Sequence, residues 1–148
     1  MSFFTIILRL LVATILSGVI GIERETHDKS AGFRTHILVC IGSALFMVTS
    51  ILISKEYGHL GDVDPSRIAA GVVTGVGFLG AGAVLRSGSA VHGLTTAASI
   101  WAVAAIGLAV GSGLYGAGVA TTIIVLLVLF LSRAKKKIEL WKTRKTRT

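Results

Sequence analysis

Residues 75–80 read GVGFLG, and the interpretation of this stretch decides the fold class. The spacing G-x-G-x-x-G marks a dinucleotide-binding loop only where a strand precedes it, a helix follows it and an acidic residue lies about 20 residues further on. Here residues 66–85 form one apolar segment without a strand–turn break, and the next acidic residue after Gly80 is Glu139. The glycines are therefore predicted to lie on an apolar helix.

The composition of the chain is that of a membrane protein. Of its 148 residues, 53% are hydrophobic and 15% are charged, and the mean hydropathy is +0.81. Soluble domains carry about 25% charged residues. A hydrocarbon core takes about 20 apolar residues, with a range of roughly 17 to 25. The sequence predicts an all-α integral membrane protein with five transmembrane helices, over residues 3–22, 37–54, 68–85, 94–110 and 114–132.

Positive charge is concentrated at the C-terminus. The net charge is +8, and eight of the 15 Lys and Arg residues lie within residues 133–148. Because cytoplasmic loops carry an excess of Lys and Arg, the N-terminus is predicted to lie outside and the C-terminus inside. Residues 1–132 then form a transmembrane domain, and residues 133–148 form a basic cytoplasmic tail. Since the tail follows an apolar run directly, we interpret it as an anchor at the lipid bilayer and predict no nucleic-acid partner.

Two parts of the sequence resemble each other. Gly18 precedes Arg24 by six residues, just as Gly80 precedes Arg86, and a Gly-x-x-Thr element follows in each part. This similarity suggests a parallel two-helix repeat, in which the first and second helices correspond to the third and fourth, with the fifth helix added. Repeats of this kind occur in transporters, with binding sites where the repeats meet. Chance similarity between glycine-rich helices is the alternative.

Small residues recur four positions apart on two of the predicted helices, at Gly71 and Gly75 and again at Gly107 and Gly111. This spacing lets helix backbones approach closely in lipid. Tight packing is therefore expected, either within the subunit or across a dimer interface. The packing face of the third helix is predicted to consist of Gly71, Gly75, Gly77, Gly80 and Gly82.

Polar residues are predicted to gather at the cytoplasmic ends of the first four helices. Two interpretations are open: interfacial ion pairs with helix caps, or a polar pocket that binds an ion or a partner loop. Glu23 and Glu25 offer oxygen ligands for Mg²⁺, but Arg24 between them makes a poor metal site, so neither a metal nor a cofactor is predicted. The candidate residues are Glu23, Arg24, Glu25, Arg34, His36, Arg86, His92, Thr95 and Thr96.

Arg9 lies about one third of the way into the first apolar run. A lone Arg at the centre of a span costs about 2.5 kcal/mol or more on insertion scales. Its side chain either extends toward the interface or finds an interior partner. Asp62 and Asp64 precede the third helix and lie at a compatible depth, so an Arg9–Asp64 pair is the hypothesis.

The sequence contains no H-E-x-x-H, no G-x-S-x-G and no P-loop, which are the motifs of metalloproteases, serine hydrolases and nucleotide-binding proteins. No two of the four histidines have the spacing of a ligand pair, and the single cysteine, Cys40, lies in an apolar run. The chain is therefore not expected to be an enzyme.

Four elements in fixed order resemble the MgtC/SapB family of bacterial inner-membrane proteins. They are GIERE at residues 21–25, GFRTHILVCIGSAL at 32–45, RIAAGVVTGVGFLGAGAVLRSG at 67–88 and VHGLTTAASIWAVAAIG at 91–107. The resemblance implies a small helical domain in the bacterial inner membrane. The positions that it singles out are Glu23, Arg24, Glu25, Arg34, Arg67, Arg86, Thr95, Thr96 and Trp101. Arg67 also belongs with the predicted outer pair of Arg9 and Asp64.

The family resemblance also implies a role. Some members are linked to growth in low magnesium, acid tolerance and virulence, and act as regulators, including through the F-type ATP synthase. One branch of the family continues into a C-terminal ACT-like domain, whereas only 16 residues follow residue 132 here. This chain is accordingly expected to be a short form.

Two functions follow from these features. The first is a non-catalytic modulator of a partner membrane protein that acts through helix packing. The second is a small dimeric transporter or channel with a polar site near the cytoplasmic side. All seven acids lie in loops, at helix ends or in the tail, whereas a cation pathway usually exposes an acid near mid-membrane. The acids thus favour the modulator, and a homodimer is expected for either function.

Overall fold

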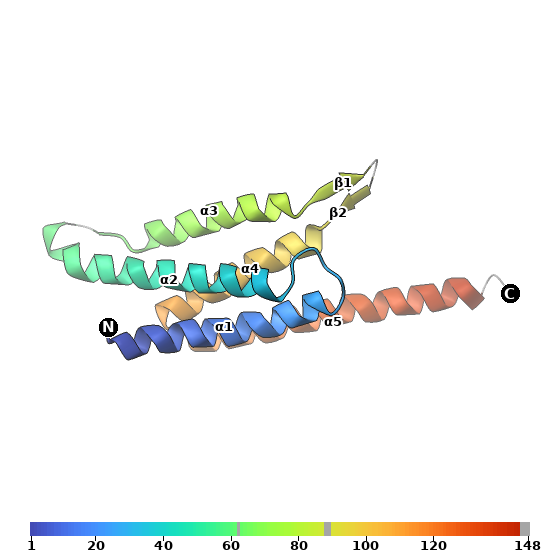
Figure 1. Ribbon diagram of the computed structural model, residues 1–148, viewed down its shortest axis with the longest axis horizontal. Coiled ribbons are helices and arrows are strands. Elements are labelled where there is room, and N and C mark those ends of the chain that lie inside the picture. The colour runs from blue at the N-terminus through green and yellow to red at the C-terminus, as the bar shows by residue number, and fades with distance from the viewer. Residues whose placement is uncertain (62, 88–89, 146–148) are drawn as a thin grey trace.

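The computed structural model describes the backbone of residues 1–61, 63–87 and 90–145, and the side chains of residues 1–61, 63–84 and 90–131. Within these residues the chain is mainly helical, with one small two-stranded sheet (Figure 1). The elements are α1 (Phe3–Glu25), α2 (Phe33–Tyr57), the 3₁₀ helix η1 (Gly58–Leu60), α3 (Ser66–Gly82), β1 (Leu85–Ser87), β2 (Ala90–His92), α4 (Leu94–Ser112) and α5 (Tyr115–Lys145).

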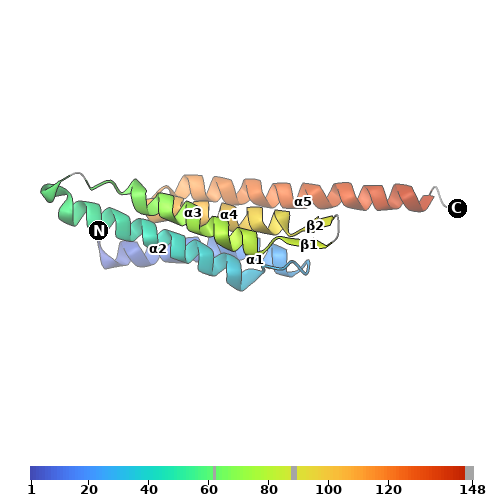
Figure 2. The same cartoon turned by 90° about the horizontal axis from the view of Figure 1, so that it is seen from above.

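Successive α-helices run in opposite directions along one bundle (Figure 1). The N-terminus, the α2–α3 connection and the turn between α4 and α5 lie at the end that we call the N-terminal end. The loop after α1 and the antiparallel β1–β2 hairpin lie at the opposite end, and α5 extends beyond them (Figure 2). We call this second end the tail end.

The main core lies between α1, α2, α4 and α5. Their buried apolar residues form one cluster: Ala13, Ile20, Cys40, Ala44, Val103, Ile106, Val110 and Leu129. The α3 helix packs outside this core, where Val76 joins a smaller cluster with Ile100 and Ala104 of α4. Among the described residues, α3 buries only Val76 and Gly80. It is therefore the peripheral helix of the bundle.

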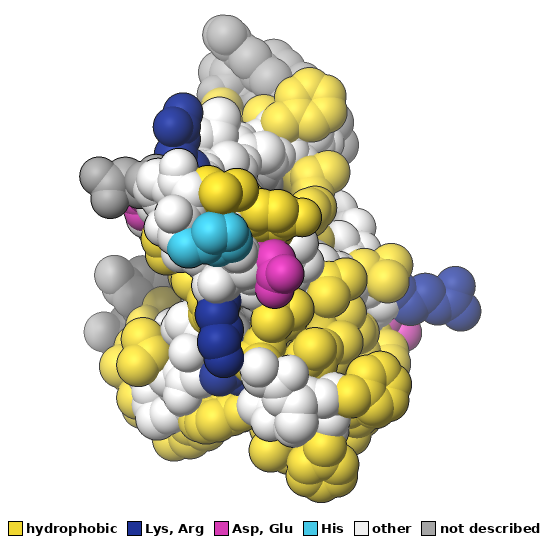
Figure 3. Space-filling model, turned by 90° about the vertical axis from the view of Figure 1, so that its left-hand side faces the viewer, with side chains coloured by type: hydrophobic (Ala, Val, Ile, Leu, Met, Phe, Trp, Pro, Cys, Tyr) yellow, Lys and Arg dark blue, Asp and Glu magenta, His cyan; other side chains and the backbone are white. Residues whose placement is uncertain are grey.

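The sides of the bundle are apolar. Within the described residues, α1, α4 and the segment Phe33–Leu60 are long and apolar enough to cross a membrane, and Ser66–Gly82 and Tyr115–Leu131 are shorter apolar helices. Large apolar side chains point outward, with Phe78 83% exposed. Seen from the N-terminal end, hydrophobic side chains cover much of the visible surface (Figure 3). So much exposed apolar surface indicates burial in lipid, and the chain is a helical membrane protein.

The third apolar run differs from the helix predicted over residues 68–85. The α3 helix ends at Gly82, and residues 85–87 form β1. Gly93, before α4, has a φ of 87°, and a Cβ at this position would collide with the carbonyl oxygen of Ala83. Only glycine adopts this conformation without strain, so Gly93 allows the hairpin to close against the end of α3.

The last helix is longer than its apolar run. The backbone of α5 is helical as far as Lys145, so much of the predicted basic tail over 133–148 continues α5. Residues 146–148 lie outside the described residues.

The predicted two-helix repeat stays a prediction. The α1–α2 and α3–α4 pairs run in the same direction along the bundle (Figure 1). Their connections differ, because a loop joins the first pair and the β-hairpin joins the second.

Candidate functional site

A buried polar cluster joins three helices near the tail end of the bundle. We define it as the side chains of Arg24, His36, Thr96 and Ser99, each of which is 4% exposed or less. Arg24 lies in the last turn of α1, His36 in the first turn of α2, and Thr96 and Ser99 near the start of α4. Since buried polar groups are costly unless they are hydrogen-bonded, the cluster specifies how these three helix ends meet.

His36 links α2 to α4. Its Nδ1 lies 2.8 Å from the carbonyl oxygen of Gly32, and its Nε2 lies 3.0 Å from the hydroxyl of Ser99. A carbonyl only accepts, so Nδ1 carries a hydrogen. The Ser99 hydroxyl also lies 2.8 Å from the carbonyl oxygen of Thr96. Its single hydrogen can be donated to that carbonyl or to Nε2, so the orientation of Ser99 is coupled to the hydrogens of the imidazole.

Arg24 links α1 to α4. Its Nη2 donates to the hydroxyl of Thr96 at 3.1 Å, while its Nε has no hydrogen-bonding partner among the described residues. The preceding residue, Glu23, is also buried, with 7% exposure. These groups are inside the protein, in contrast to ordinary interfacial ion pairs, which are solvated and weak. This part of the candidate set is therefore a buried cluster between helices, and the predicted polar pocket that binds an ion or a partner loop stays a prediction.

Glu25 has a different role from its neighbours. Its side chain is exposed, and Oε2 accepts a hydrogen bond from the backbone N–H of Phe33 at 2.7 Å. The carboxylate thus satisfies an N–H in the first turn of α2 and lies at the positive end of that helix dipole. A Cβ on Gly32 would come within 2.7 Å of the same oxygen. Glu25 is therefore a helix cap, as the other interpretation of the candidate set expects.

Four other candidates have exposed side chains: Arg34, His92, Thr95 and Trp101. Arg86 lies in β1, and its side chain is outside the described residues. Thr95 and Thr96 are neighbours on α4, and a helix turns by about 100° per residue, so only Thr96 faces the bundle. The structure brings Arg24, His36 and Thr96 together and leaves these four apart from them.

Ser99 belongs to the cluster but was not among the candidates from the sequence. It lies three residues after Thr96 on α4, and residues three apart share a helix face. Extending the pattern from Thr96 by one turn would have identified it. Among the described residues, no group of three His, Cys, Asp or Glu side chains is arranged to hold a metal ion.

The structure places Arg9 away from its predicted partner. Its Nη1 donates to the carbonyl oxygen of Gly111 at 2.6 Å, near the C-terminus of α4, and not to Asp64. A cation at a helix C-terminus interacts favourably with the last carbonyls and the helix dipole. Sequence spacing could not reveal this acceptor, because it is a backbone atom 102 positions away. The prediction of an Arg9–Asp64 pair is therefore wrong. Asp62 lies outside the described residues.

Asp64 instead lies two residues before Ser66, the first residue of α3, and binds it. Its Oδ1 accepts from the backbone N–H of Ser66 at 2.8 Å, and its Oδ2 accepts from the Ser66 hydroxyl at 2.7 Å. The hydroxyl of Ser66, its N–H and the nearby charge of Arg67 hold the pKa of the Asp64 carboxyl below its ordinary value of 3.8. This is the capping role that an Asp-Pro pair before a helix predicts.

The cap at Asp64 should be sensitive to acid. Because its pKa is lowered in the folded state, its contribution to stability is present above the ordinary value and is lost as the pH falls through the folded-state pKa. Unfolding free energies measured from about pH 5 down to about pH 2 should therefore show a component that Asp64→Asn removes. An identical acid profile for wild type and Asp64→Asn would contradict this assignment.

Glycines four positions apart are closely packed on α4 but not on α3. A Cβ on Gly107 would collide with the carbonyl oxygen of Cys40, and a Cβ on Gly111 would lie 2.5 Å from that of Ala44. By contrast, a Cβ on Gly71 or Gly75 would meet nothing within 4 Å, and the same holds for Gly77 and Gly82, whereas Gly80 packs on Ala97. Thus α4 uses its glycines to approach α2, and most of the predicted packing face of α3 is open within one subunit.

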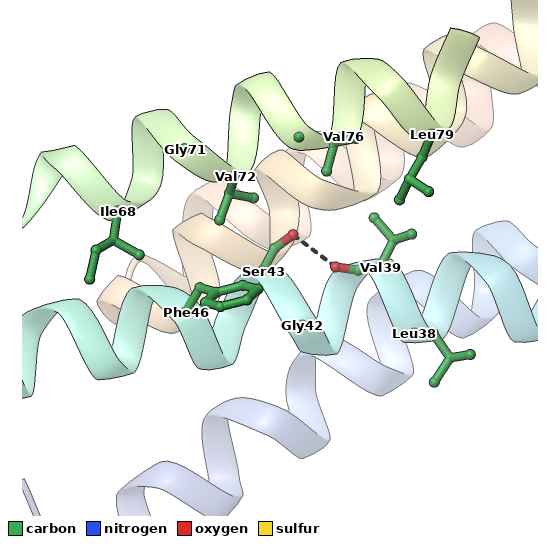
Figure 4. Close-up of a pocket in the computed structure, with 11 residues that line it drawn as sticks. Leu38, Val39, Gly42, Ser43, Phe46, Ile68, Gly71, Val72, Val76 and Leu79 are labelled. Carbon is green, nitrogen blue, oxygen red and sulfur yellow. Dashed lines mark hydrogen bonds between the residues drawn. The ribbon is translucent and has the colours of Figure 1, made fainter. Parts of the chain in front are cut away.

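An apolar groove runs between α2 and α3, with a volume of about 660 Å³ (Figure 4). We call it the α2–α3 groove. The α3 side is lined by Ile68, Gly71, Val72, Gly75, Val76 and Leu79, and the α2 side by Leu38, Val39, Gly42, Ser43 and Phe46. A second cavity of about 330 Å³ is lined by Ser50, Ile53, Val63, Asp64, Arg67 and Ile68. Because Ile68 lines both, the second cavity adjoins the groove at this residue, and we call it the mouth of the groove.

The fold and the buried polar cluster are those of a small helical membrane protein. Comparison with known families shows to which family it belongs. The family model described as "MgtC family" matches residues 10–138. Since this match covers most of the chain, the chain belongs to the MgtC family, as the motifs of the sequence indicated.

Named relatives support the same assignment. The Escherichia coli (strain K12) protein described as "Putative magnesium transporter YhiD" is 51% identical over 131 residues, which cover 83% of this chain and 58% of that protein. "Protein MgtC" of Salmonella typhimurium (strain LT2) is 43% identical over 133 residues, covering 90% of this chain and 54% of that protein. This chain thus spans little more than half the length of the relatives it matches. No solved structure is similar enough to match.

Proposed function

We propose that this chain is a non-catalytic inner-membrane module that modulates a partner membrane protein, in a process linked to magnesium or proton homeostasis and to stress or virulence adaptation. The observation that carries the proposal is the open outer face of α3. We further propose that all five helices cross the membrane, with the N-terminus outside and the C-terminus inside, as the charge distribution favours.

The outer face of α3 consists of Ala70, Thr74, Gly77 and Ala81, which follow one another at helical spacing and are all exposed. These residues do not line the α2–α3 groove. Phe78 is beside them and is 83% exposed. Small residues on a lipid-facing helix allow another helix to approach its backbone closely, and an adjacent aromatic ring adds apolar contact area.

The chemistry of this face fits a transmembrane helix of another protein. It is apolar apart from Thr74, whose hydroxyl already donates to the carbonyl oxygen of Ala70 at 3.1 Å. The family resemblance makes the F-type ATP synthase the first partner to test. The same face is also suited to a second copy of this chain.

A second function has an observation in its favour. The buried polar cluster around Arg24 and His36 lies between α1, α2 and α4, where a transporter could hold a solute. In this alternative the chain is a small dimeric transporter or channel. Purified protein in liposomes would then conduct Mg²⁺, H⁺ or K⁺, and Arg24→Gln would abolish the flux. Such a result would contradict the modulator.

The modulator is tested with inverted membrane vesicles that contain F-type ATP synthase and this chain. Wild-type protein should reduce ATP-driven proton pumping. Gly77→Leu should weaken that effect about tenfold, because overpacking a close helix contact costs roughly 1–3 kcal/mol. The matched control is Gly116→Leu on α5, since a Cβ on Gly116 also meets nothing within 4 Å. Equal effects of the two variants, or pumping that the wild type leaves unchanged, would contradict the proposal.

A further inference from the structure

We propose that the α2–α3 groove is a binding site for one glycerophospholipid, with an acyl chain along the groove and the headgroup phosphate on Arg67. This site is separate from the outer face of α3 and from the buried polar cluster. It concerns a lipid ligand and does not depend on the identity of a protein partner.

The groove has the length of one leaflet. Its α3 wall runs from Ile68 to Leu79, which corresponds to about 17 Å at 1.5 Å per helical residue. Half of a bilayer's hydrocarbon core is about 15 Å. The groove begins beside the first turn of α3 at the N-terminal end of the bundle, where a headgroup would lie, and continues inward as far as an acyl chain reaches.

The walls of the groove are apolar. The hydroxyl of Ser43 donates to the backbone carbonyl of Val39 at 2.8 Å, so it presents no unused donor to the groove (Figure 4). Gly71 and Gly75 add no side chain to the α3 wall, and the space beside them is open, since nothing lies within 4 Å of a Cβ at either position. An acyl chain makes no hydrogen bonds, so an apolar surface without unused donors is suited to bind it.

The enclosed part of the groove has a smaller volume than a helix of the same length. A volume of 660 Å³ spread over about 17 Å gives a mean cross-section of about 40 Å². A helix with its side chains has a diameter of at least about 10 Å, and therefore a cross-section of about 80 Å². The dimensions favour a single hydrocarbon chain over a helix from a second copy of the protein.

The mouth of the groove is held in place by hydrogen bonds from α2. The hydroxyl of Ser50 donates to the carbonyl oxygen of Pro65 at 2.5 Å, and the hydroxyl of Ser54 donates to that of Val63 at 2.9 Å. These bonds attach the segment before α3 to α2. The backbone next to the charged residues of the mouth is therefore attached to α2 beside the apolar groove.

The charges at the mouth match a phospholipid headgroup. The guanidinium of Arg67 has no hydrogen-bonding partner among the described residues, and it is suited to bidentate binding of phosphate. Asp64 carries the opposite charge and lines the same cavity. One cation and one anion side by side complement a zwitterionic headgroup, with phosphate on Arg67 and ammonium near Asp64. Phosphatidylethanolamine fits this pair of charges, and its ammonium can donate hydrogen bonds to the Asp64 carboxylate.

The test is native mass spectrometry of the purified full chain in detergent, titrated with palmitoyl-oleoyl phosphatidylethanolamine. We expect one lipid to bind per protein. Gly75→Leu should reduce its affinity about tenfold or more by filling the groove, since overpacking a tight contact costs this much. Gly77→Leu is the matched control, because it adds the same side chain to α3 outside the groove and should keep wild-type affinity.

The headgroup is tested separately. Arg67→Gln should weaken binding about tenfold or more, because it removes a charge-assisted contact to phosphate. Lys55→Gln removes a cation at the same end of the bundle, outside the mouth cavity, and should have no effect. Palmitoyl-oleoyl glycerol, which lacks phosphate, should bind about tenfold more weakly than the phospholipid.

Specific results would overturn the proposal. They are equal lipid binding by Gly75→Leu and Gly77→Leu, equal binding by Arg67→Gln and Lys55→Gln, or equal affinity for the lipid without phosphate. A disulfide between cysteines placed at Gly75 in two copies would show that a second copy occupies the groove. Thermal unfolding of each variant establishes that it is folded, and Arg67→Gln keeps the test available if Gly75→Leu does not fold.

Discussion

Gly111→Ala is expected to lower the free energy of unfolding by about 2–3 kcal/mol, because overpacking a tight contact costs about this much. A Cβ at this position would lie 2.5 Å from the carbonyl oxygen of Ala44 and 2.8 Å from the Cβ of Met47. Backbone atoms cannot move aside as a flexible side chain can, so α2 and α4 would have to separate. Gly107→Ala should have a similar effect, because its Cβ would collide with the carbonyl oxygen of Cys40.

The control uses the same substitution on α3. Nothing lies within 4 Å of a Cβ on Gly71 or Gly75, and alanine stabilises a helix interior relative to glycine by about 0.5–1 kcal/mol. Gly71→Ala and Gly75→Ala should therefore be neutral or slightly stabilising. Reversible unfolding of the four purified variants in mixed micelles measures the difference. If the α3 and α4 variants lose stability equally, the α2–α4 contact is not as close as described.

His36→Leu is expected to lower the free energy of unfolding by about 2–4 kcal/mol. His36 is 0% exposed, and both ring nitrogens lie within hydrogen-bonding distance of oxygen atoms, on Gly32 and Ser99. Each lost hydrogen bond costs about 1 kcal/mol, and more where a buried group is left without a partner. A branched side chain in the space of a flat ring adds a packing cost. The same unfolding assay measures the sum.

Two variants give this prediction its controls. His92→Leu removes an exposed histidine from β2 and should change stability by less than about 0.5 kcal/mol, as surface substitutions do. His36→Gln places an amide near the position of Nε2, so it should keep the bond to Ser99 and recover about 1 kcal/mol. A Leu variant as stable as the Gln variant would mean that packing, and not hydrogen bonding, accounts for the role of His36.

Much of the fold could be predicted from the sequence, because apolar runs and charge distribution are local properties. Each predicted apolar run contains a helix. The end of the third run was less predictable. Residues 83–85 are apolar enough to continue a helix, but Gly93 allows the β-hairpin to return against Ala83.

The candidate site was predicted in part. The family motifs contained Arg24, His36 and Thr96, and the structure brings these residues together. The motifs could not separate Thr96, which is buried, from Thr95, which is exposed. They also could not indicate that Arg9 binds a backbone carbonyl of α4, because every residue has such an acceptor and only the packing of α1 on α4 selects one.

The stretch GVGFLG illustrates which properties of the protein follow from its sequence and which follow only from its tertiary structure. The sequence by itself determined that these glycines lie on an apolar helix, because no strand precedes them and no acid follows at the required distance. It also determined that α3 and α4 share a pattern of small residues four apart. Only the tertiary structure decided that Gly107 and Gly111 pack against α2, while Gly71 and Gly75 line an open groove. The physical reason is that a glycine permits close approach without requiring it, and the position of the neighbouring helix decides whether that approach occurs.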